Sequence, residues 1–298
     1  MNHFGLDLGG TKISAIALDE KGNELARTRQ PTPKNYKEIV AHCVSLVREM
    51  EKQAPGEFTL GVGSPGVIDR AAGQVNFSPN IPDMKGKFLA RDLEKSLGTC
   101  VQLANDAVCF ALSESADGAA AGLHRVYGII LGTGVGGALA ENGHYVPGPN
   151  TLFEWGHITL PWLDEKDMPM PRCACGRLGC IEAYLSGRSL HNQLSESIGR
   201  DITNDELNAL LAKRVPGVMD VTNNYVRRLA KALAMLITIL DPDALVLGGG
   251  VSNLDMLYED MVRRAGKYMV VPGIKTKILK AKFGDDSGLR GAAWLGSK

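Results

Sequence analysis

The sequence predicts an α/β protein of two domains, and three observations support this prediction. Short apolar strands and amphipathic helices are interspersed along the chain. A strand, a glycine-rich turn and a second strand occur twice, near residues 5 and 127, which indicates a weak internal duplication. The length of 298 residues corresponds to two domains at roughly 150 residues each.

The N-terminal segment is expected to form three antiparallel strands and then a helix. Apolar runs at residues 4–8 and 13–18 are separated by a glycine turn, and a further strand follows the turn at 19–23. Residues 36–52 carry apolar side chains at helical spacing. The same criteria next predict a strand, a helix, a strand and a helix, at residues 59–63, 88–97, 101–103 and 107–121.

The second half of the chain repeats the strand–turn–strand pattern before it becomes helical. Strands at 126–131 and 138–140 flank a glycine-rich turn. Residues 220–240 form the clearest helix, because four leucines make one stripe and Asp241-Pro242 ends it. A buried strand at 244–247 and a C-terminal helix at 288–295 complete the expected elements.

Composition and charge exclude several classes of protein. Lys plus Arg and Asp plus Glu both number 33, so the formal net charge is zero. A chain without a cationic surplus is unsuited to non-specific binding of nucleic acid or of an anionic membrane. No apolar run is long enough to cross a membrane, and the N-terminus lacks a signal-peptide pattern. We therefore expect a cytoplasmic protein with reduced cysteines.

Three glycine-rich turns, each after an apolar strand, are candidate phosphate-binding sites. Bare backbone lets successive N–H groups converge on an anion, and threonine hydroxyls and a lysine add donors. The alternative is three ordinary tight turns. Neither the P-loop motif nor the dinucleotide fingerprint is present. The candidate residues in these turns are Asp7, Gly9, Gly10, Thr11, Lys12, Gly132, Thr133, Gly134, Gly136, Gly249 and Gly250.

A cluster of cysteines has the composition of a metal site. Cys173, Cys175 and Cys180 lie within eight residues, and glycines between them allow the chain to fold back. Three thiolates and one imidazole make a tetrahedral zinc shell. Among six histidines, His157 is favoured by its nearness and its neighbour Gly156. The alternative is three reduced cysteines in a loop. The remaining cysteines, at 43, 100 and 109, are expected in the core.

Taken together and in order, these motifs resemble the ROK family (repressors, open reading frames and sugar kinases). The resemblance extends from residue 4 to about residue 295. It is carried by the turns at 7–12 and 131–137, by Asn105-Asp106, by Glu154-Trp155-Gly156-His157, and by the cysteine motif ending in Ile181-Glu182.

The resemblance implies an actin/hexokinase-like (ribonuclease H-like) two-domain fold with a central cleft. A small domain, 1–118, would be completed by the C-terminal helix at 288–298, and a larger domain, 119–287, would carry the zinc motif. ATP would lie across the glycine turns with Mg²⁺, and Asp7 is a plausible partner of Mg²⁺ through water or simply a residue at the end of a strand. His157 would be the fourth ligand of a structural zinc.

The resemblance also implies a catalytic site. Asp106 would be the base that takes a proton from the sugar hydroxyl, although its position equally suits a helix N-cap. The sugar would be bound by Asn80, Asn105, Asp106, Glu154, His157 and Glu182, with the second ring nitrogen of His157 facing the sugar. Without the resemblance, Glu154 and Glu182 would be taken as solvated surface residues.

The identity of the sugar is the least determined feature. The stretches at 117–122 and 155–162 and the end around Arg290 resemble bacterial fructokinases and mannokinases. The stretches at 80–87 and 184–188 resemble N-acetylglucosamine kinases, and Phe153 replaces the glycine usual in both branches. A kinase acting at the 6-position of a fructose-, mannose- or glucose-type hexose leads narrowly, with an N-acetylglucosamine kinase as the alternative.

A non-catalytic sugar sensor or repressor-like protein is the alternative of another class. Repressors of the family carry a helix-turn-helix of some 80 residues before the first phosphate turn, which begins here at residue 7. We therefore expect a sugar and ATP as partners and neither nucleic acid nor membrane. A homodimer is possible, because family members are commonly dimers.

Overall fold

The computed structural model describes residues 1–69, 72–78, 80–146, 154–271 and 273–297. Packing divides the chain into two units. Unit 1 comprises Met1–Gly128, Ala138–Phe153 and Lys282–Lys298, and unit 2 comprises Ile129–Gly137 and Glu154–Ala281. These units differ in their bounds from the expected domains 1–118 with 288–298 and 119–287, which stay a prediction. Phe153 lies outside the described residues.

The first sheet has the strand order β3-β2-β1-β4-β7 and belongs to unit 1. β1 (Asn2–Leu8), β2 (Lys12–Leu18) and β3 (Glu24–Pro31) pair antiparallel, as predicted. β4 (Phe58–Ser64) and β7 (Val101–Asn105) extend the sheet in parallel with β1. Since neighbouring parallel strands end at the same edge, Asp7 and Asn105 both stand at this edge.

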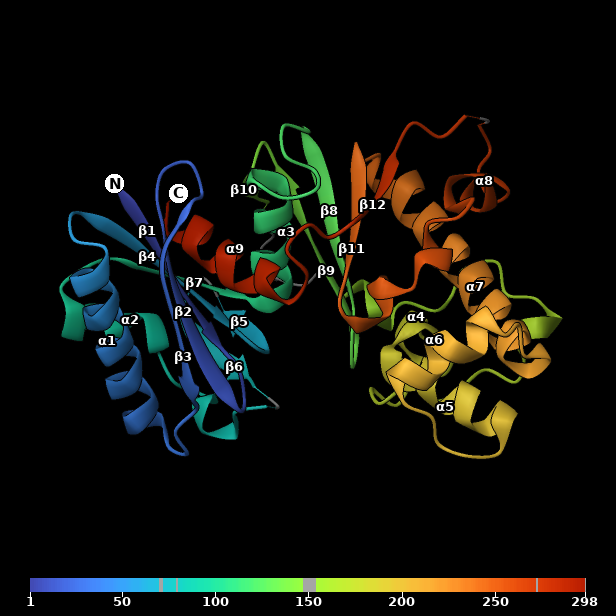
Figure 1. The fold of residues 1–298 in the computed structure, drawn as a ribbon, viewed down its shortest axis with the longest axis horizontal. Coiled ribbons are helices and arrows are strands. Elements are labelled where there is room, and N and C mark those ends of the chain that lie inside the picture. Colours follow the sequence, from blue (N-terminus) through green and yellow to red (C-terminus); the bar gives the residue numbers. More distant parts are fainter. Residues whose placement is uncertain (70–71, 79, 147–153, 272, 298) are drawn as a thin grey trace. The chain divides into compact units, whose positions relative to one another are not determined.

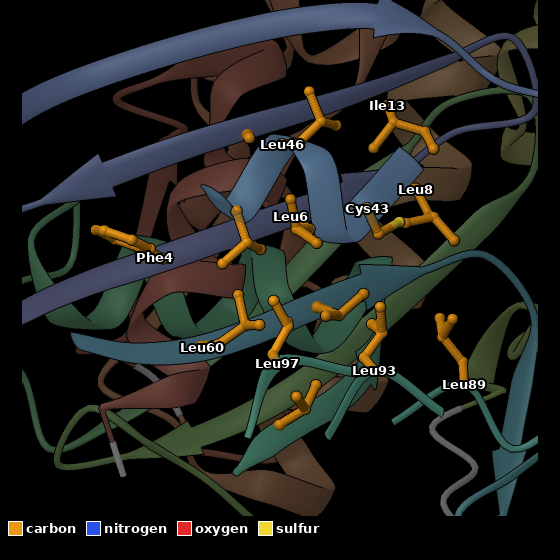
Figure 2. Packing of buried hydrophobic residues seen from close by; sticks show 14 of the residues in the cluster. Phe4, Leu6, Leu8, Ile13, Cys43, Leu46, Leu60, Leu89, Leu93 and Leu97 are labelled. Atoms are coloured by element: carbon orange, nitrogen blue, oxygen red, sulfur yellow. The ribbon is translucent and has the colours of Figure 1, made fainter. Parts of the chain in front are cut away.

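Helices cover both faces of this sheet (Figure 1). α1 (Tyr36–Gln53) and α2 (Leu89–Leu97) pack on one face, with alternate strand residues such as Leu6 and Leu60 between them. Figure 2 shows this buried cluster, which includes Cys43 of α1. The intervening strand residues face α9 (Ser287–Gly296), and α3 (Asp106–Ala116) packs against α9. Because side chains alternate between the two faces of a strand, successive residues of β1 and β4 face α1 and α2 on one side and α9 on the other.

Glycine allows α9 to approach its neighbours at backbone distance. A Cβ built on Gly291 would lie 1.6 Å from the carbonyl oxygen of Cys109 in α3, and one on Gly61 of β4 would lie 2.0 Å from the carbonyl oxygen of Ala292. No side chain fits at either point. These contacts place the C-terminal helix against the N-terminal sheet within unit 1.

The structure corrects the predicted end of the helix that follows Asp106. α3 ends at Ala116 and not at residue 121. The reason is Glu114, which is fully buried and accepts hydrogen bonds from the Ala119 and Lys282 amides, at 2.8 and 3.1 Å, and from the Ser287 hydroxyl at 2.7 Å. The chain turns around this carboxylate. Local helical propensity cannot reveal such a contact.

The second five-stranded sheet has the order β10-β9-β8-β11-β12. β8 (Arg125–Leu131) and β9 (Val135–Glu141) are the second strand–glycine turn–strand pair, and β11 (Ala244–Gly248) was also predicted. β9 begins three residues before the predicted start at 138, so the turn comprises residues 132–134, and Gly136 lies in the strand. β10 (His144–Tyr145) and β12 (Lys277–Lys280) were not predicted, nor was the hairpin of β5 (Val67–Asp69) and β6 (Gln74–Phe77). Each is short, which leaves little periodicity to detect.

The helices of unit 2 are α4 (Ile181–Leu185), α5 (Gly187–Ile198), α6 (Asn204–Ala212), α7 (Pro216–Leu240) and α8 (Met261–Gly266). α7 begins four residues before the predicted start, because proline is well suited to the first helical position. Three-residue and four-residue 3₁₀ turns also occur, among them Trp155–His157 and Gly250–Asn253. Within the described ranges, no helix combines the length and apolarity needed to span a membrane.

A buried ion cluster fixes the loop before the cysteine motif onto α7. Asp167 is 1% exposed and accepts from Arg227, Arg228 and Lys231 at 2.6–3.0 Å. These contacts hold the pKa of Asp167 well below its usual range, against the effect of burial. Lys231 is equally buried and also reaches Asp164. The cluster is part of the scaffold of unit 2.

Two of the three cysteines expected in the core are there. Cys43 and Cys109 are buried, whereas Cys100 is exposed in the turn between α2 and β7, so that prediction is wrong. A cysteine in a short apolar segment was mistaken for a core residue.

The close crossing of α9 and α3 generates a stability prediction. Gly291→Ala is expected to lower the free energy of unfolding by about 3 kcal/mol or more, because the added methyl group overlaps a backbone carbonyl. Gly288→Ala in the same helix is the matched control. Its Cβ would meet nothing within 4 Å, so its stability should stay equal or rise by up to about 1 kcal/mol. Urea unfolding of both variants tests this, and equal stabilities would contradict it.

Candidate active site

The first glycine turn connects β1 to β2 in unit 1. The Gly9 amide donates to the Lys12 carbonyl at 2.9 Å, and the Thr32 hydroxyl donates to the Gly9 carbonyl at 2.6 Å. Gly10 lies against Asn80, whose carbonyl oxygen would be 2.7 Å from an added Cβ. Thr11, Lys12 and Asn80 are exposed. The structure therefore brings the predicted Asn80 loop and the predicted phosphate turn together.

The edge of the first sheet carries Asp7, Asn105 and Asp106. Asn105 is the N-cap of α3, since its side-chain oxygen accepts from the Val108 amide at 2.9 Å. The cap interpretation of Asp106 is therefore wrong, because Asp106 is the first residue inside the helix. Its carboxylate accepts from the Ala107 amide at 2.9 Å. The cap uses only the oxygen of Asn105, so the Asn105 amide group can donate to a ligand.

The carboxyl groups of Asp7 and Asp106 are harder to ionise than ordinary carboxyl groups. Burial, and secondarily the charge of Asp106, raises the pKa of Asp7 to about 6, although Lys12 and Arg29 oppose the rise. Burial also raises the pKa of Asp106, and the Ala107 amide opposes this. The Asp106 side chain reaches solvent even though protein surrounds it, so water limits the rise there.

The two glycine turns of unit 2 lie against each other. Gly132 and Gly134 close the first turn with a backbone hydrogen bond of 3.0 Å. Gly249 adopts a φ of +80°, and its Cβ would lie 2.6 Å from the Leu131 carbonyl oxygen, so only glycine fits. A Cβ on Gly250 would meet no atom within 4 Å, and Thr133 is exposed. Although the two turns lie close together, Gly250 and Thr133 therefore remain accessible to a ligand.

A cavity of about 600 Å³ begins at these turns and lies wholly within unit 2. Its volume is in the range of small-ligand sites. The described residues lining it are Leu131, Gly132, Thr133, Gly187, Arg188, Leu190, His191, Leu194, Ile202, Thr203, Leu207, Gly250, Val251, Asn253 and Leu254. The wall formed by α5 was missed at the sequence level. The spacing of Leu190 and Leu194 was a signal for that helix.

The predicted metal ligands converge in unit 2. The ligand atoms of His157, Cys173, Cys175 and Cys180 lie within 4.8 Å of one another. The sulfur atoms of Cys175 and Cys180 are 3.7 Å apart, and the Cys173 sulfur is 3.5 Å from His157 Nδ1. A tetrahedral zinc shell requires about 3.8 Å between sulfurs and about 3.6 Å between sulfur and imidazole nitrogen. The donor set and its spacing therefore fit zinc, with Nδ1 as the histidine ligand.

Glu182 connects this cluster to the glycine turn at 132–134 and to Val135, the first residue of β9. One carboxylate oxygen accepts from the Val135 amide at 3.0 Å, and the other lies 3.8 Å from the Cys173 sulfur. A Cβ on Gly134 would lie 2.7 Å from the same carboxylate. Glu182 is therefore not a solvated surface residue. Glu154 is about half exposed, and its carboxylate lies 3.9 Å from His157 Nε2.

The raised pKa of Asp7 predicts a stability cost at neutral pH. The folded state binds the Asp7 proton more tightly than the unfolded chain does, so stability falls as pH rises from about 4 to about 6. Asp7→Asn should raise the free energy of unfolding by about 1–3 kcal/mol at pH 7.5 and by nothing near pH 4. Asp255→Asn, at a side chain 91% exposed, should change stability by under about 0.5 kcal/mol. Equal thermal midpoints of Asp7→Asn and the parent at pH 7.5 would contradict this account.

The geometry of the cysteine cluster predicts zinc binding that depends on Cys175. Cys175→Ser should reduce the zinc content from about one ion per chain to a small fraction of that, because a hydroxyl group replaces one of the four ligands. Cys100→Ser removes an exposed cysteine outside the cluster and should leave the zinc content unchanged. Elemental analysis of both purified variants tests this. A Cys175→Ser protein with one zinc per chain would remove Cys175 from the ligand set.

Comparison with known proteins identifies the family of the chain. The family model described as ROK family matches residues 3–298. The chain is 39% identical over 303 residues to the N-acetyl-D-glucosamine kinase of Photobacterium profundum, and the alignment covers 99% of each protein. Among solved structures, it is similar to a ROK hexokinase from Thermus thermophilus, with a TM-score of 0.88, 31% identity and coverage of 100% and 98% of the two chains. A ROK family glucokinase from Streptomyces griseus, in complex with glucose and AMPPNP, gives a TM-score of 0.77 at 28% identity, with coverage of 100% and 99%. The chain belongs to the ROK family.

Proposed function

We propose that this chain is an ATP-dependent sugar kinase that phosphorylates N-acetyl-D-glucosamine. One observation carries the choice of sugar: the 39% identity to a kinase named for that sugar extends over 99% of both proteins. The same activity was the alternative suggested by the Asn80 and Tyr184 stretches.

Asp106 is proposed as the base for the sugar hydroxyl. Its carboxylate is solvent-accessible, and its carboxyl pKa is raised, which increases its affinity for the proton that the hydroxyl loses. Because Asn105 caps α3, Asp106 is not needed for that purpose. The Asn105 amide group can donate to a sugar oxygen while its carbonyl holds the cap.

The three glycine turns are proposed to bind the phosphates of ATP. Their exposed donors are backbone amides, the Thr11 and Thr133 hydroxyls and the Lys12 ammonium group. Mg²⁺ bound with ATP would neutralise part of the phosphate charge, and Asp7 is the candidate to hold its water shell. Gly132, Thr133 and Gly250 of these turns line the cavity of unit 2, which is large enough for the rest of the nucleotide.

Glu154, His157 and Glu182 are proposed to bind the sugar from unit 2. A structural zinc would hold His157 Nδ1 and thereby keep the proton on Nε2, which can donate to a sugar hydroxyl. One oxygen of Glu182 is used by the Val135 amide, and the other can accept from a hydroxyl. Loss of zinc would therefore weaken sugar binding as well as the local fold.

A hexose kinase acting at the 6-position is the second candidate, favoured by the likeness to a ROK hexokinase. The three sequence cues for fructose or mannose each include a residue with a structural role, however. Asp117 and Arg290 form an ion pair inside unit 1. Trp162 stacks on Tyr268 with ring centroids 5.4 Å apart. Asn80, by contrast, lies against the proposed phosphate turn.

A sugar panel tests the proposal. ADP release with Mg²⁺-ATP should show kcat/KM for N-acetylglucosamine at least about tenfold above that for fructose, mannose, glucose and N-acetylmannosamine.

Asp106→Asn should lower kcat by about 10²- to 10⁴-fold without unfolding the protein. Asp260→Asn, an exposed residue next to α8, should leave kcat unchanged.

Preference for a hexose would favour the second candidate. No turnover with any sugar, from folded and zinc-loaded protein, would favour a non-catalytic sugar sensor. An Asp106→Asn variant with nearly full activity would remove Asp106 as the base.

A further inference from the structure

The cavity of unit 2 has one permanently charged side chain in its wall. Among the described residues that line it, that side chain is Arg188. The glycine turns form one part of the lining, and the rest is largely apolar, with Leu190, Leu194, Ile202 and Leu207. A nucleoside triphosphate carries several negative charges, which backbone amides alone balance poorly.

Arg188 stands close in sequence to a residue that contacts the turn at 132–134. It is the second residue of α5, and the amide of the first, Gly187, donates to the Gly132 carbonyl at 2.6 Å. A Cβ on Gly187 would lie 3.0 Å from that carbonyl oxygen and 3.2 Å from Val251, so glycine permits this approach. The start of α5 is thereby fixed to the turn, and Arg188 follows directly.

Arg188 occupies an electrostatically unfavourable position for the helix. A cation in the first turn opposes the helix dipole by about 0.3–1 kcal/mol, and α5 has no acidic residue there to compensate. The cap is made by Ser186, whose hydroxyl oxygen accepts from the Ser189 amide. Across the described part of the chain no carboxylate pairs with Arg188, and its side chain is exposed. Helix amides and guanidinium therefore add their positive potentials beside the turn, which favours a bound anion.

We propose that Arg188 binds the phosphate chain of the nucleotide. This inference rests on the proposed function and adds a residue to it. A guanidinium group donates two parallel hydrogen bonds to phosphate oxygens, which suits Arg better than Lys at this point. Arg188 lines the cavity and directly follows the residue that is bonded to the turn, so in this proposal its guanidinium group contacts the phosphates and the apolar walls contact the nucleoside.

Calorimetric binding of ADP and of adenosine to the full-length, zinc-loaded protein tests the proposal. Arg188→Ala should raise the Kd for ADP by about 10- to 100-fold and change the Kd for adenosine by less than about twofold. The KM for ATP should rise in parallel, whereas kcat and the KM for sugar should stay within about threefold. Arg188→Lys should give an intermediate Kd for ADP, since it retains the charge without the planar fork.

Lys267→Ala is the matched control, because Lys267 is an exposed cation at the end of α8 outside the cavity lining. It should leave both Kd values unchanged. An unchanged ADP affinity in Arg188→Ala would overturn the inference and leave the proposed function standing. Equal weakening of ADP and adenosine would also overturn it, since Arg188 would then shape the cavity. A parent protein that binds no ADP and turns over no sugar would instead reject the proposed function itself.

Discussion

Close contact of backbone with backbone is the constraint on which the remaining structure depends. In unit 1, Gly61 and Gly291 let α9 lie directly on β4 and α3. In unit 2, Gly249 lies on the carbonyl of Leu131, and Gly187 lies beside Gly132. The absence of a side chain at glycine therefore permits the close packing of the scaffold, and it also leaves the backbone of the turns accessible to an anion. The need for such close contacts accounts for part of the high glycine content, which is 35 residues in a chain of 298. Where a Cβ would overlap a carbonyl oxygen, no repacking of side chains can restore the contact.

Carboxylates organise the elements that glycine brings close. Glu114 has a structural role, because its carboxylate accepts hydrogen bonds from two chain segments that are far apart in sequence. Glu182 divides its two oxygens between a backbone amide and the cysteine cluster, so it couples the proposed phosphate turn to the proposed sugar site. Asp7 stands at the edge of the first sheet, and burial raises the pKa of its carboxyl group. Retaining such a group lowers stability at neutral pH, which is understandable if the group serves binding or catalysis.

The sequence predicted the elements that are determined by neighbouring residues in the chain. The antiparallel strands, α1 and the body of α7 follow from alternation, helical spacing and Asp241-Pro242. The convergence of the cysteines followed from their spacing and the two glycines between them. Contacts distant in sequence account for most of what was missed. Only the fold reveals that Glu114 ends α3, and that Asn105 rather than Asp106 caps it. The stretches around Asp117 and Arg290 resembled one branch of sugar kinases, yet these residues pair with each other. A resemblance that arises from packing carries no information about the substrate.

The zero net charge of the chain conceals a local organisation. Each unit places one cation beside a glycine turn: Lys12 follows the turn in unit 1, and Arg188 begins the helix that contacts the turn in unit 2. Lys12 is balanced nearby, since its charge lowers the pKa of Asp7 against the effect of burial. Arg188 has no such carboxylate in the described part of the chain and lies in the first turn of a helix, where a cation is disfavoured. An unbalanced charge at an unfavourable position is best explained by a ligand that supplies the opposite charge. Asp7 already balances the charge of Lys12, whereas a bound nucleotide would supply the negative charge that Arg188 lacks. For this reason we expect nucleotide binding to be more sensitive to the loss of Arg188 than to the loss of Lys12.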